Sequence, residues 1–216
     1  MDAVLFDMDG VLVDSEEYWV TFEREALFPD AVPDETVDLA ETSGMNYRDT
    51  YDYLATTYET AISREEFVCR FEAAAEEIYT ERVAVLDGLH ELLAELDDRG
   101  VSRALVSSSP HEWIELVLDR FDLEGEFDHV VSADDIEAHS KPEPDVFEYA
   151  AEKAGVPPDT CVVVEDSENG IEAGDRAGTT VVAYRIDAHG DIDLSPADTI
   201  VDSADELRAT VLELVD

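Results

Sequence analysis

Short apolar runs rich in β-branched residues alternate with longer helical patterns along this chain, and this alternation constrains the fold more than any other feature. The runs are AVLF (3–6), RALVS (103–107), HVVS (129–132), CVVVE (161–165), TVVAY (180–184) and, more weakly, TIV (199–201). Because the runs are apolar throughout, they are typical of strands buried on both faces. Such strands separated by helices predict an α/β fold with a Rossmann-like, doubly wound parallel sheet.

The helical patterns between these strands carry their own boundary signals. An apolar stripe from Leu89 to Leu96 ends at Gly100, a residue suited to the position after a helix. A second helix is expected after Ser109 and Pro110, which suit the N-cap and the first helical position. Both helices would cover the sheet.

Residues 15–82 interrupt the alternation. They contain no strand-like run of Val and Ile, and instead carry the helical patterns EEYWVTFEREALF, YRDTYDYLATTY and REEFVCRFEAAAEEIY. We therefore expect residues 1–14 and 83–216 to form an α/β core, with residues 15–82 inserted as an all-α helical cap. The cap would sit above the sheet edge where the first strand ends.

The net charge is −43, and acidic residues are spread over the whole chain. A field of this sign repels nucleic acid and anionic membranes, so neither is expected as a partner. No apolar run approaches the roughly 18–20 residues that span a bilayer, and no signal-peptide pattern opens the chain. These features favour a cytoplasmic protein, and we expect it to be a monomer or a weak homodimer.

The balance of basic residues points to a salt-rich cytoplasm. Lys141 and Lys153 are the only lysines, against eleven arginines. Concentrated salt would screen the self-repulsion of so many acids, because the Debye length falls to roughly 3 Å at 1 M. Cys69 and Cys161 lie far apart with no pairing pattern, so both are expected to be buried thiols in a reducing compartment.

Polar residues gather where several of the expected strands end. The carboxyl ends of parallel strands meet at one edge of a sheet, where open α/β sheets bind their ligands. The residues at this edge are Asp7 and Asp9 after the first strand, Ser107 and Ser108 at the second, Glu165 and Asp166 at the fourth, and Lys141 in a preceding loop. Convergence from such separated positions indicates a reaction site.

These residue types suit phosphoryl transfer. Several carboxylates at one edge cannot all stay ionised without a cation, and Mg²⁺ prefers carboxylate and phosphate oxygens. Asp7 could then attack phosphorus, as in enzymes that form an aspartyl phosphate, while Asp9 serves as the acid and base. The hydroxyl of Ser107 and the ammonium of Lys141 could hold the phosphoryl oxygens.

Four motifs together resemble the haloacid dehalogenase-like hydrolase superfamily. They are DMDGVLVDSE, the Ser107 of ALVSSSP, the Lys141 of SKPEPDVF, and EDSENGIEAG. They match the family in order and spacing along nearly the whole core, and the helical insertion resembles the family's small α-helical cap. The most similar group contains phosphoglycolate phosphatases, β-phosphoglucomutases and sugar-phosphate phosphatases.

The resemblance implies a role for each motif residue. Asp7 would be the nucleophile and Asp9 the general acid and base. Mg²⁺ would be bound by Asp7, Asp166 and the backbone carbonyl of Asp9, with Glu165 acting through water. Lys141 would pair with Asp7 and the phosphate.

Substrate contacts follow from the same resemblance. Ser107 and Ser108 would bind the phosphoryl group, and the cap segment from Gly44 to Arg48 would contribute to recognition. The family's dehalogenating members lack an aspartate at the position of Asp9, so dehalogenation is disfavoured.

The reaction has open alternatives. Transfer of the phosphoryl group to water makes a phosphatase of a small phosphorylated metabolite, whereas transfer to a bound sugar phosphate makes a mutase. The mutases of this group carry a cap histidine where this chain has Tyr18 and Trp19, and a cap arginine where it has Tyr47, with Arg48 adjacent. Phosphatase is therefore our prediction, ahead of a mutase and of a non-enzymatic acidic binding protein.

Several residues keep a structural interpretation beside the functional one. Ser107 also suits a helix entry, and Ser109 is the better candidate for that cap. Asp14 could bind the loop that leads into the cap or contact substrate. Trp19 and Trp113 are interpreted as packing residues.

Two further expectations concern glycines and histidines. Gly170 and Gly174 interrupt a helix, which close packing against the sheet would explain. None of the five histidines has the spacing of a metal site, and we expect His111 and His139 at the surface.

Overall fold

A computed structural model describes residues 1–42, 45–136 and 140–216, so the predicted contact at Gly44 and the position of His139 lie outside the described residues. The strands are β1 (Ala3–Phe6), β2 (Ser102–Ser107), β3 (His129–Ser132), β4 (Cys161–Glu165), β5 (Thr180–Tyr184) and β6 (Thr199–Val201). They occupy the six predicted apolar runs, with β2 starting one residue earlier.

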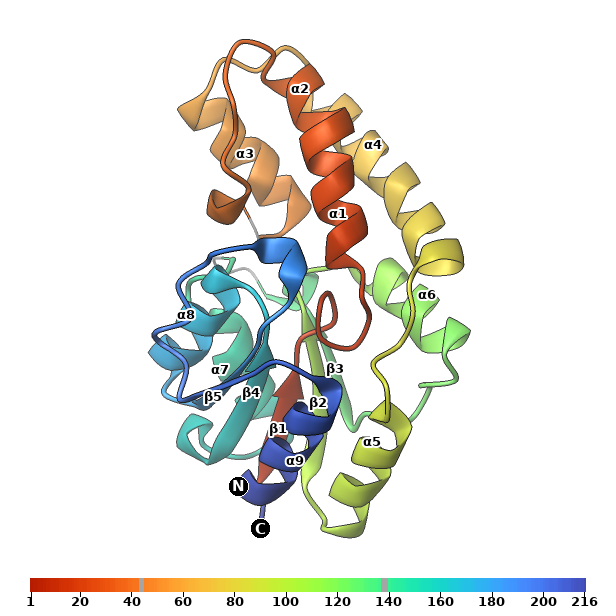
Figure 1. The fold of residues 1–216 in the computed structure, drawn as a ribbon, viewed down its shortest axis with the longest axis vertical. Coiled ribbons are helices and arrows are strands. Elements are labelled where there is room, and N and C mark those ends of the chain that lie inside the picture. Colours follow the sequence, from red (N-terminus) through yellow and green to blue (C-terminus); the bar gives the residue numbers. More distant parts are fainter. Residues whose placement is uncertain (43–44, 137–139) are drawn as a thin grey trace.

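The helices lie in two groups (Figure 1). Those above the sheet edge are α1 (Glu16–Phe22), α2 (Phe28–Ala31), α3 (Tyr47–Thr57) and α4 (Arg64–Glu77). Those around the sheet are α5 (Leu89–Asp98), α6 (His111–Arg120), α7 (Asp145–Ala154), α8 (Glu168–Ala177) and α9 (Ala204–Leu214). None of the helices in the described ranges is long and apolar enough to cross a membrane.

The sheet is parallel, with the strand order β3-β2-β1-β4-β5-β6. Successive residues of β1 face opposite layers: Val4 and Phe6 join the core with α5, α6 and α9, whereas Ala3 and Leu5 join the core with α7 and α8. A sheet covered on both faces explains the continuously apolar strands. The predicted Rossmann-like α/β fold is confirmed.

Residues 15–82 form helices and turns, with no strand among those described. The chain leaves the core and returns to it side by side, because the amide of Asp14 donates to the carbonyl of Ala84 (3.1 Å) and the amide of Ala84 donates to Asp14 Oδ1 (2.5 Å). Asp14 therefore ties the entering and returning segments together. We propose this crossing as the boundary between core and cap.

Aromatic rings fill the contact between the two parts. Trp113 of α6 stacks on Trp19 of α1 at 5.7 Å between ring centroids, and on Tyr47 of α3 at 4.7 Å. Stacked aromatic pairs add to the free energy gained from burial alone. Both tryptophans are packing residues, as predicted.

Close packing accounts for two glycines of α8. A Cβ on Gly174 would lie 2.9 Å from Val181 Cγ2 of β5, and one on Gly170 would lie 1.9 Å from Glu165 Oε1. Both distances are too short for a side chain. The prediction that this helix packs tightly on the sheet is confirmed.

The prediction for one cysteine is wrong. Cys161 is buried in β4, but Cys69 is exposed. The buried residues of α4 are Phe67, Phe71 and Ala75, which share one face of the helix. Cys69 follows Phe67 by two positions, about 200° around a helix of 3.6 residues per turn, so it faces solvent.

Candidate active site

Asp7 and Lys141 form a buried ion pair at the carboxyl edge of the sheet. Asp7 directly follows β1, and its amide donates to the carbonyl of Val164 in β4 (3.0 Å). Lys141 reaches it from the loop before α7, with 2.6 Å between Nζ and Asp7 Oδ1. The Lys141 side chain is 2% exposed, so water barely screens this pair.

Glu165 binds the other side of the same ammonium. Its Oε1 lies 2.6 Å from Lys141 Nζ, while its Oε2 accepts from the Asp166 amide and from the amide and hydroxyl of Ser167. Both carboxylate oxygens therefore have partners within the protein. In this geometry Glu165 holds Lys141, and its role near a metal through water stays a prediction.

Burial and charge oppose each other in this group. Burial raises the pKa of the Asp7 carboxyl, and the Lys141 ammonium counteracts that shift by favouring the ionised form. Burial would lower the pKa of Lys141, but Asp7 and Glu165 outweigh it and hold that pKa above its ordinary value. Lys141 thus stays cationic, but it only partly offsets the burial and the neighbouring carboxylates, so the pKa of Asp7 stays well above its ordinary value.

Asp9 is held by three hydroxyl groups from separate parts of the chain. Its Oδ1 accepts from Ser15 Oγ (2.6 Å) and Tyr79 OH (2.7 Å), and its Oδ2 accepts from Ser109 Oγ (3.1 Å). Burial and the neighbouring Asp9 charge raise the pKa of Tyr79, so its phenol stays protonated and donates. The carboxyl group of Asp9 is oriented before any ligand arrives.

Ser109 does not cap α6, contrary to prediction. The helix begins at His111, Pro110 takes the capping position, and no side chain caps the helix. The Ser109 hydroxyl instead donates to Asp9. The helix begins one residue later than predicted, so Ser109 lies before the capping position, and its hydroxyl donates to a carboxylate instead.

Asp166 faces a histidine that sequence reasoning dismissed. His189 Nε2 lies 2.8 Å from Asp166 Oδ2 and 3.6 Å from Glu16 Oε2 of α1. Burial raises the pKa of Asp166 to about 6. Burial would lower the pKa of His189, but its hydrogen bond to Asp166 and the nearby carboxylates raise it to about 9. His111, by contrast, lies at the surface as predicted.

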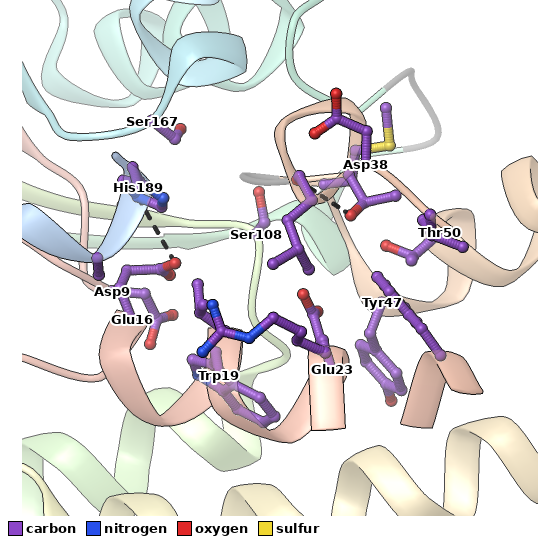
Figure 2. Close-up of a pocket in the computed structure, with 18 of the residues that line it drawn as sticks. Asp9, Glu16, Trp19, Glu23, Asp38, Tyr47, Thr50, Ser108, Ser167 and His189 are labelled. Atoms are coloured by element: carbon purple, nitrogen blue, oxygen red, sulfur yellow. Dashed lines mark hydrogen bonds and ion pairs between the residues drawn. The ribbon is translucent and has the colours of Figure 1, made fainter. Parts of the chain in front are cut away.

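A cavity of about 1080 Å³ opens above these groups, between the sheet edge and helices α1 to α3. Figure 2 shows Asp9, Ser167 and His189 on the core side of it, and Trp19, Glu23 and Tyr47 on the opposite side. Ser107, Ser108, Lys141 and Asp166 also line this cavity. The predicted groups from separate strands therefore reach one cavity.

The two predicted phosphate-binding serines lie together at the end of β2. Ser107 is buried, and its Oγ accepts from the Ser109 amide at 3.0 Å. The Ser108 carbonyl accepts from Asn46 Nδ2 at 2.8 Å, a contact between the core and α3. Arg48 is turned elsewhere: it pairs with Asp134 at 3.2 Å and lines a separate cavity of about 260 Å³. Its predicted contact with substrate stays a prediction.

The buried carboxylates form a group that could bind a metal ion. Asp7, Glu165 and Asp166 each offer an oxygen, and these oxygens lie within 4.8 Å of one another. Hard oxygen donors of this kind bind Mg²⁺ in preference to softer metal ions. Glu16, Asp166 and His189 form a second such group, which shares Asp166 with the first.

Comparison with known proteins matches this geometry to a family. A family model described as "Haloacid dehalogenase-like hydrolase" matches residues 4–184. The chain belongs to this family. The matched range begins in β1 and ends with β5, so it contains all four motifs and the helical insertion.

Relatives within this family are similar over most of their length. Hexitol phosphatase B of Escherichia coli (strain K12) is 35% identical over 210 residues, covering 96% of this chain and 94% of that protein. A phosphorylated carbohydrates phosphatase of Thermotoga maritima is 32% identical over 179 residues, covering 82% of both chains. A hydrolase structure of the haloacid dehalogenase family from Deinococcus radiodurans R1, with bound phosphate and sodium, is 31% identical with a TM-score of 0.69, covering 99% of this chain and 96% of the other.

Sequence reasoning missed the residues that hold the motif side chains. Tyr79 and Ser15 contact Asp9, Ser109 was given another role, and His189 contacts Asp166. The one available signal for His189 was its place in the loop after β5, which ends at the same sheet edge. Nothing local marked Tyr79.

Proposed function

We propose that this protein is a Mg²⁺-dependent phosphatase that hydrolyses a small phosphate monoester through an aspartyl phosphate on Asp7. The observation that carries the proposal is the buried Asp7–Lys141 pair beside the hydroxyl-held Asp9, both opening into one cavity. A carboxyl group paired with a lysine next to an oriented acid is the arrangement that phosphoryl transfer needs. The named phosphatases among the relatives support the same reaction.

In the first step, an oxygen of Asp7 attacks the phosphorus of the ester. The bond between phosphorus and the alcohol oxygen breaks, and Asp9 donates its proton to that oxygen, so the alcohol leaves neutral. Lys141 and the hydroxyl of Ser107 hold phosphoryl oxygens as negative charge shifts onto them.

In the second step, a water molecule attacks the phosphorus of the aspartyl phosphate. Asp9, now ionised, takes a proton from this water. The bond between phosphorus and Asp7 breaks, which releases inorganic phosphate and restores both aspartates to their starting states. The hydroxyls of Ser15, Tyr79 and Ser109 keep Asp9 in place through both steps.

We propose Mg²⁺ as the cofactor, held by Asp7, Asp166 and the backbone carbonyl of Asp9. The donor set fits this ion, because it combines buried, oxygen-bearing carboxylates at one sheet edge. When bound, the ion neutralises charge on the phosphoryl oxygens and relieves the repulsion between the carboxylates.

We propose a phosphorylated sugar or sugar alcohol as the substrate, in preference to phosphoglycolate. Glu16 and Glu23 line the cavity, where their carboxyl groups can form hydrogen bonds with the hydroxyl groups of a sugar. Among the described lining residues, Arg24 is the one arginine. The named activities of the Escherichia coli and Thermotoga maritima relatives point to the same class.

The cavity wall disfavours the mutase alternative. Tyr18 and Trp19 stand where mutases of this group carry a histidine, and Trp19 stacks on Trp113. A second phosphate would also need cationic partners in the cap, where Arg24 is the one arginine among the described lining residues and the acids Glu23 and Asp38 line the cavity as well.

The test is a phosphatase assay with Mg²⁺ at low and high KCl, using a hexitol phosphate, a hexose phosphate, phosphoglycolate and p-nitrophenyl phosphate. We expect turnover of the first two by the wild-type protein. Asp7→Asn should lower kcat by on the order of 10⁴-fold or more. Unchanged turnover in Asp7→Asn, or none in the wild type, would support a binding protein instead. Transfer between sugar phosphates without phosphate release would support a mutase.

We also propose a salt-rich cytoplasm as the setting and a monomer or weak homodimer as the state. The support is the net charge of −43, which concentrated salt would screen. An unfolding midpoint that rises with KCl concentration would agree with this setting.

A further inference from the structure

A loop outside the family motifs closes one side of the candidate metal site. After β5 the chain crosses the sheet edge, and a 3₁₀ turn (Asp187–His189) packs against α1. This turn delivers His189, whose side chain is 3% exposed. Figure 2 shows His189 and Glu16 on the same side of the cavity.

His189 joins a core carboxylate to a cap carboxylate. Its Nε2 lies 2.8 Å from Asp166 Oδ2 and 3.6 Å from Glu16 Oε2. The Asp166 carboxylate accepts this hydrogen bond from the side chain of His189.

The two other carboxylates of the metal group are positioned differently. Lys141 holds both Asp7 and Glu165, and backbone amides also hold Glu165. Asp166 does not contact this lysine by hydrogen bond. His189, which lies in a different element of the chain, therefore contributes to its orientation.

We propose that His189 is a positioning residue for the cation: it fixes the rotamer of Asp166 and so increases the affinity of the site for Mg²⁺. Partners that orient a metal-binding side chain typically contribute about 10–100-fold to metal affinity. Because Glu16 belongs to α1, the same ring also couples this orientation to the position of the cap. The inference concerns the metal site of the proposed function, but it does not require any ester to be turned over.

The experiment measures Mg²⁺ binding by isothermal titration calorimetry without substrate. His189→Ala should bind Mg²⁺ about 10–100-fold more weakly than the wild-type protein. His189→Gln keeps an N–H donor and should restore most of the affinity. The matched control is His111→Gln, because His111 also lies 2.8 Å from an aspartate, Asp135, but at the surface. That control should bind Mg²⁺ like the wild type.

A second measurement separates positioning from general stability. With saturating Mg²⁺, His189→Ala should regain kcat for p-nitrophenyl phosphate, and KM for the ester should match the wild type. Equal Mg²⁺ affinity in His189→Ala and the wild type would overturn the proposal, even if the variant unfolds more easily. If His189→Ala does not fold, His189→Gln and His189→Asn decide. Weak Mg²⁺ binding by the Asn variant with normal binding by the Gln variant would support the proposal, because only Gln is long enough to place an N–H near the position of Nε2. Weak Mg²⁺ binding by both variants would overturn it.

Discussion

The three carboxylates that could bind a metal, Asp7, Glu165 and Asp166, are held at two ends. At one end, Lys141 lies between Asp7 and Glu165, all within the α/β core. At the other end, His189 lies between Asp166 of the core and Glu16 of α1. The first contact joins the two central strands through one long side chain. The second depends on a loop and on the position of the cap. The lysine contact therefore requires only the sheet edge, whereas the histidine contact also requires the cap.

The two ends also differ in the groups that hold them. Lys141 makes two contacts of 2.6 Å, and the backbone amides of the β4–α8 turn fix the Glu165 side chain. His189 makes one hydrogen bond of 2.8 Å and a longer ion pair of 3.6 Å. We therefore expect damage at the lysine end to abolish chemistry and lower stability, and damage at the histidine end to weaken metal binding.

Replacing the lysine should have the largest effect. Lys141→Met keeps the length of the side chain but leaves Asp7 and Glu165 without a cation. We expect kcat/KM to fall by about 10²–10³-fold. The free energy of unfolding should fall by about 3–5 kcal/mol, because one partner of a buried ion pair is lost. Steady-state kinetics and urea unfolding measure both. Lys153→Met, at the exposed second lysine, should change neither.

Two glycine substitutions then test each end separately. On Gly170, a Cβ would lie 1.9 Å from Glu165 Oε1, the oxygen that binds Lys141; on Gly10, it would lie 1.9 Å from Asp166 Oδ2, the oxygen that binds His189. Gly170→Ala should lower the unfolding free energy by about 1–3 kcal/mol and reduce activity. Gly10→Ala should weaken Mg²⁺ binding about 10-fold, as loss of His189 does.

The control for these variants is Gly100→Ala. Gly10 has a φ of +76° and Gly100 a φ of +71°, but a Cβ on Gly100 meets nothing within 4 Å. It therefore reports the backbone cost of about 1–2 kcal/mol without any clash. If Gly10→Ala and Gly170→Ala changed Mg²⁺ affinity equally, the distinction between the two ends would be wrong.

Glu23 carries a carboxyl group in the cap. Among the described residues, no cation lies as close to it as Lys141 lies to Asp7 or His189 lies to Asp166. Burial raises its pKa from 4.5 to about 8, against the opposing charge of His189. From pH 4.5 to about 8, the native state binds this proton more tightly than the unfolded chain does. Its contribution to stability is therefore complete below pH 4.5 and is lost as the pH rises through about 8.

Glu23→Gln should remove this dependence. Urea unfolding between pH 4.5 and about 8 should show the wild-type protein losing stability relative to Glu23→Gln as the pH rises. Above this range the difference in the free energy of unfolding should be constant. Glu17→Gln is the matched control, since Glu17 is exposed on α1, the helix that ends one residue before Glu23. A difference that does not vary with pH would show that Glu23 titrates as it does in the unfolded chain.

The strands and the motif residues could be predicted because their signals are local. Each buried strand is a continuous apolar run, and Asp7, Ser107 and Glu165 stand at the ends of such runs. Parallel strands bring those ends to one edge whatever the details of packing. The exposure of Cys69 was not predicted, because a single thiol carries no signal for the face of a helix.

The sequence by itself determined the parallel sheet, the helical character of residues 15–82 and the chemistry at the strand ends. Only the tertiary structure decided which side chains hold that chemistry in place. Tyr79 lies 70 positions from Asp9, Ser109 lies 100 positions from it, and His189 lies 23 positions from Asp166. Hydrogen bonds over such separations depend on how the cap and the loop after β5 pack on the sheet, and no local pattern encodes that packing.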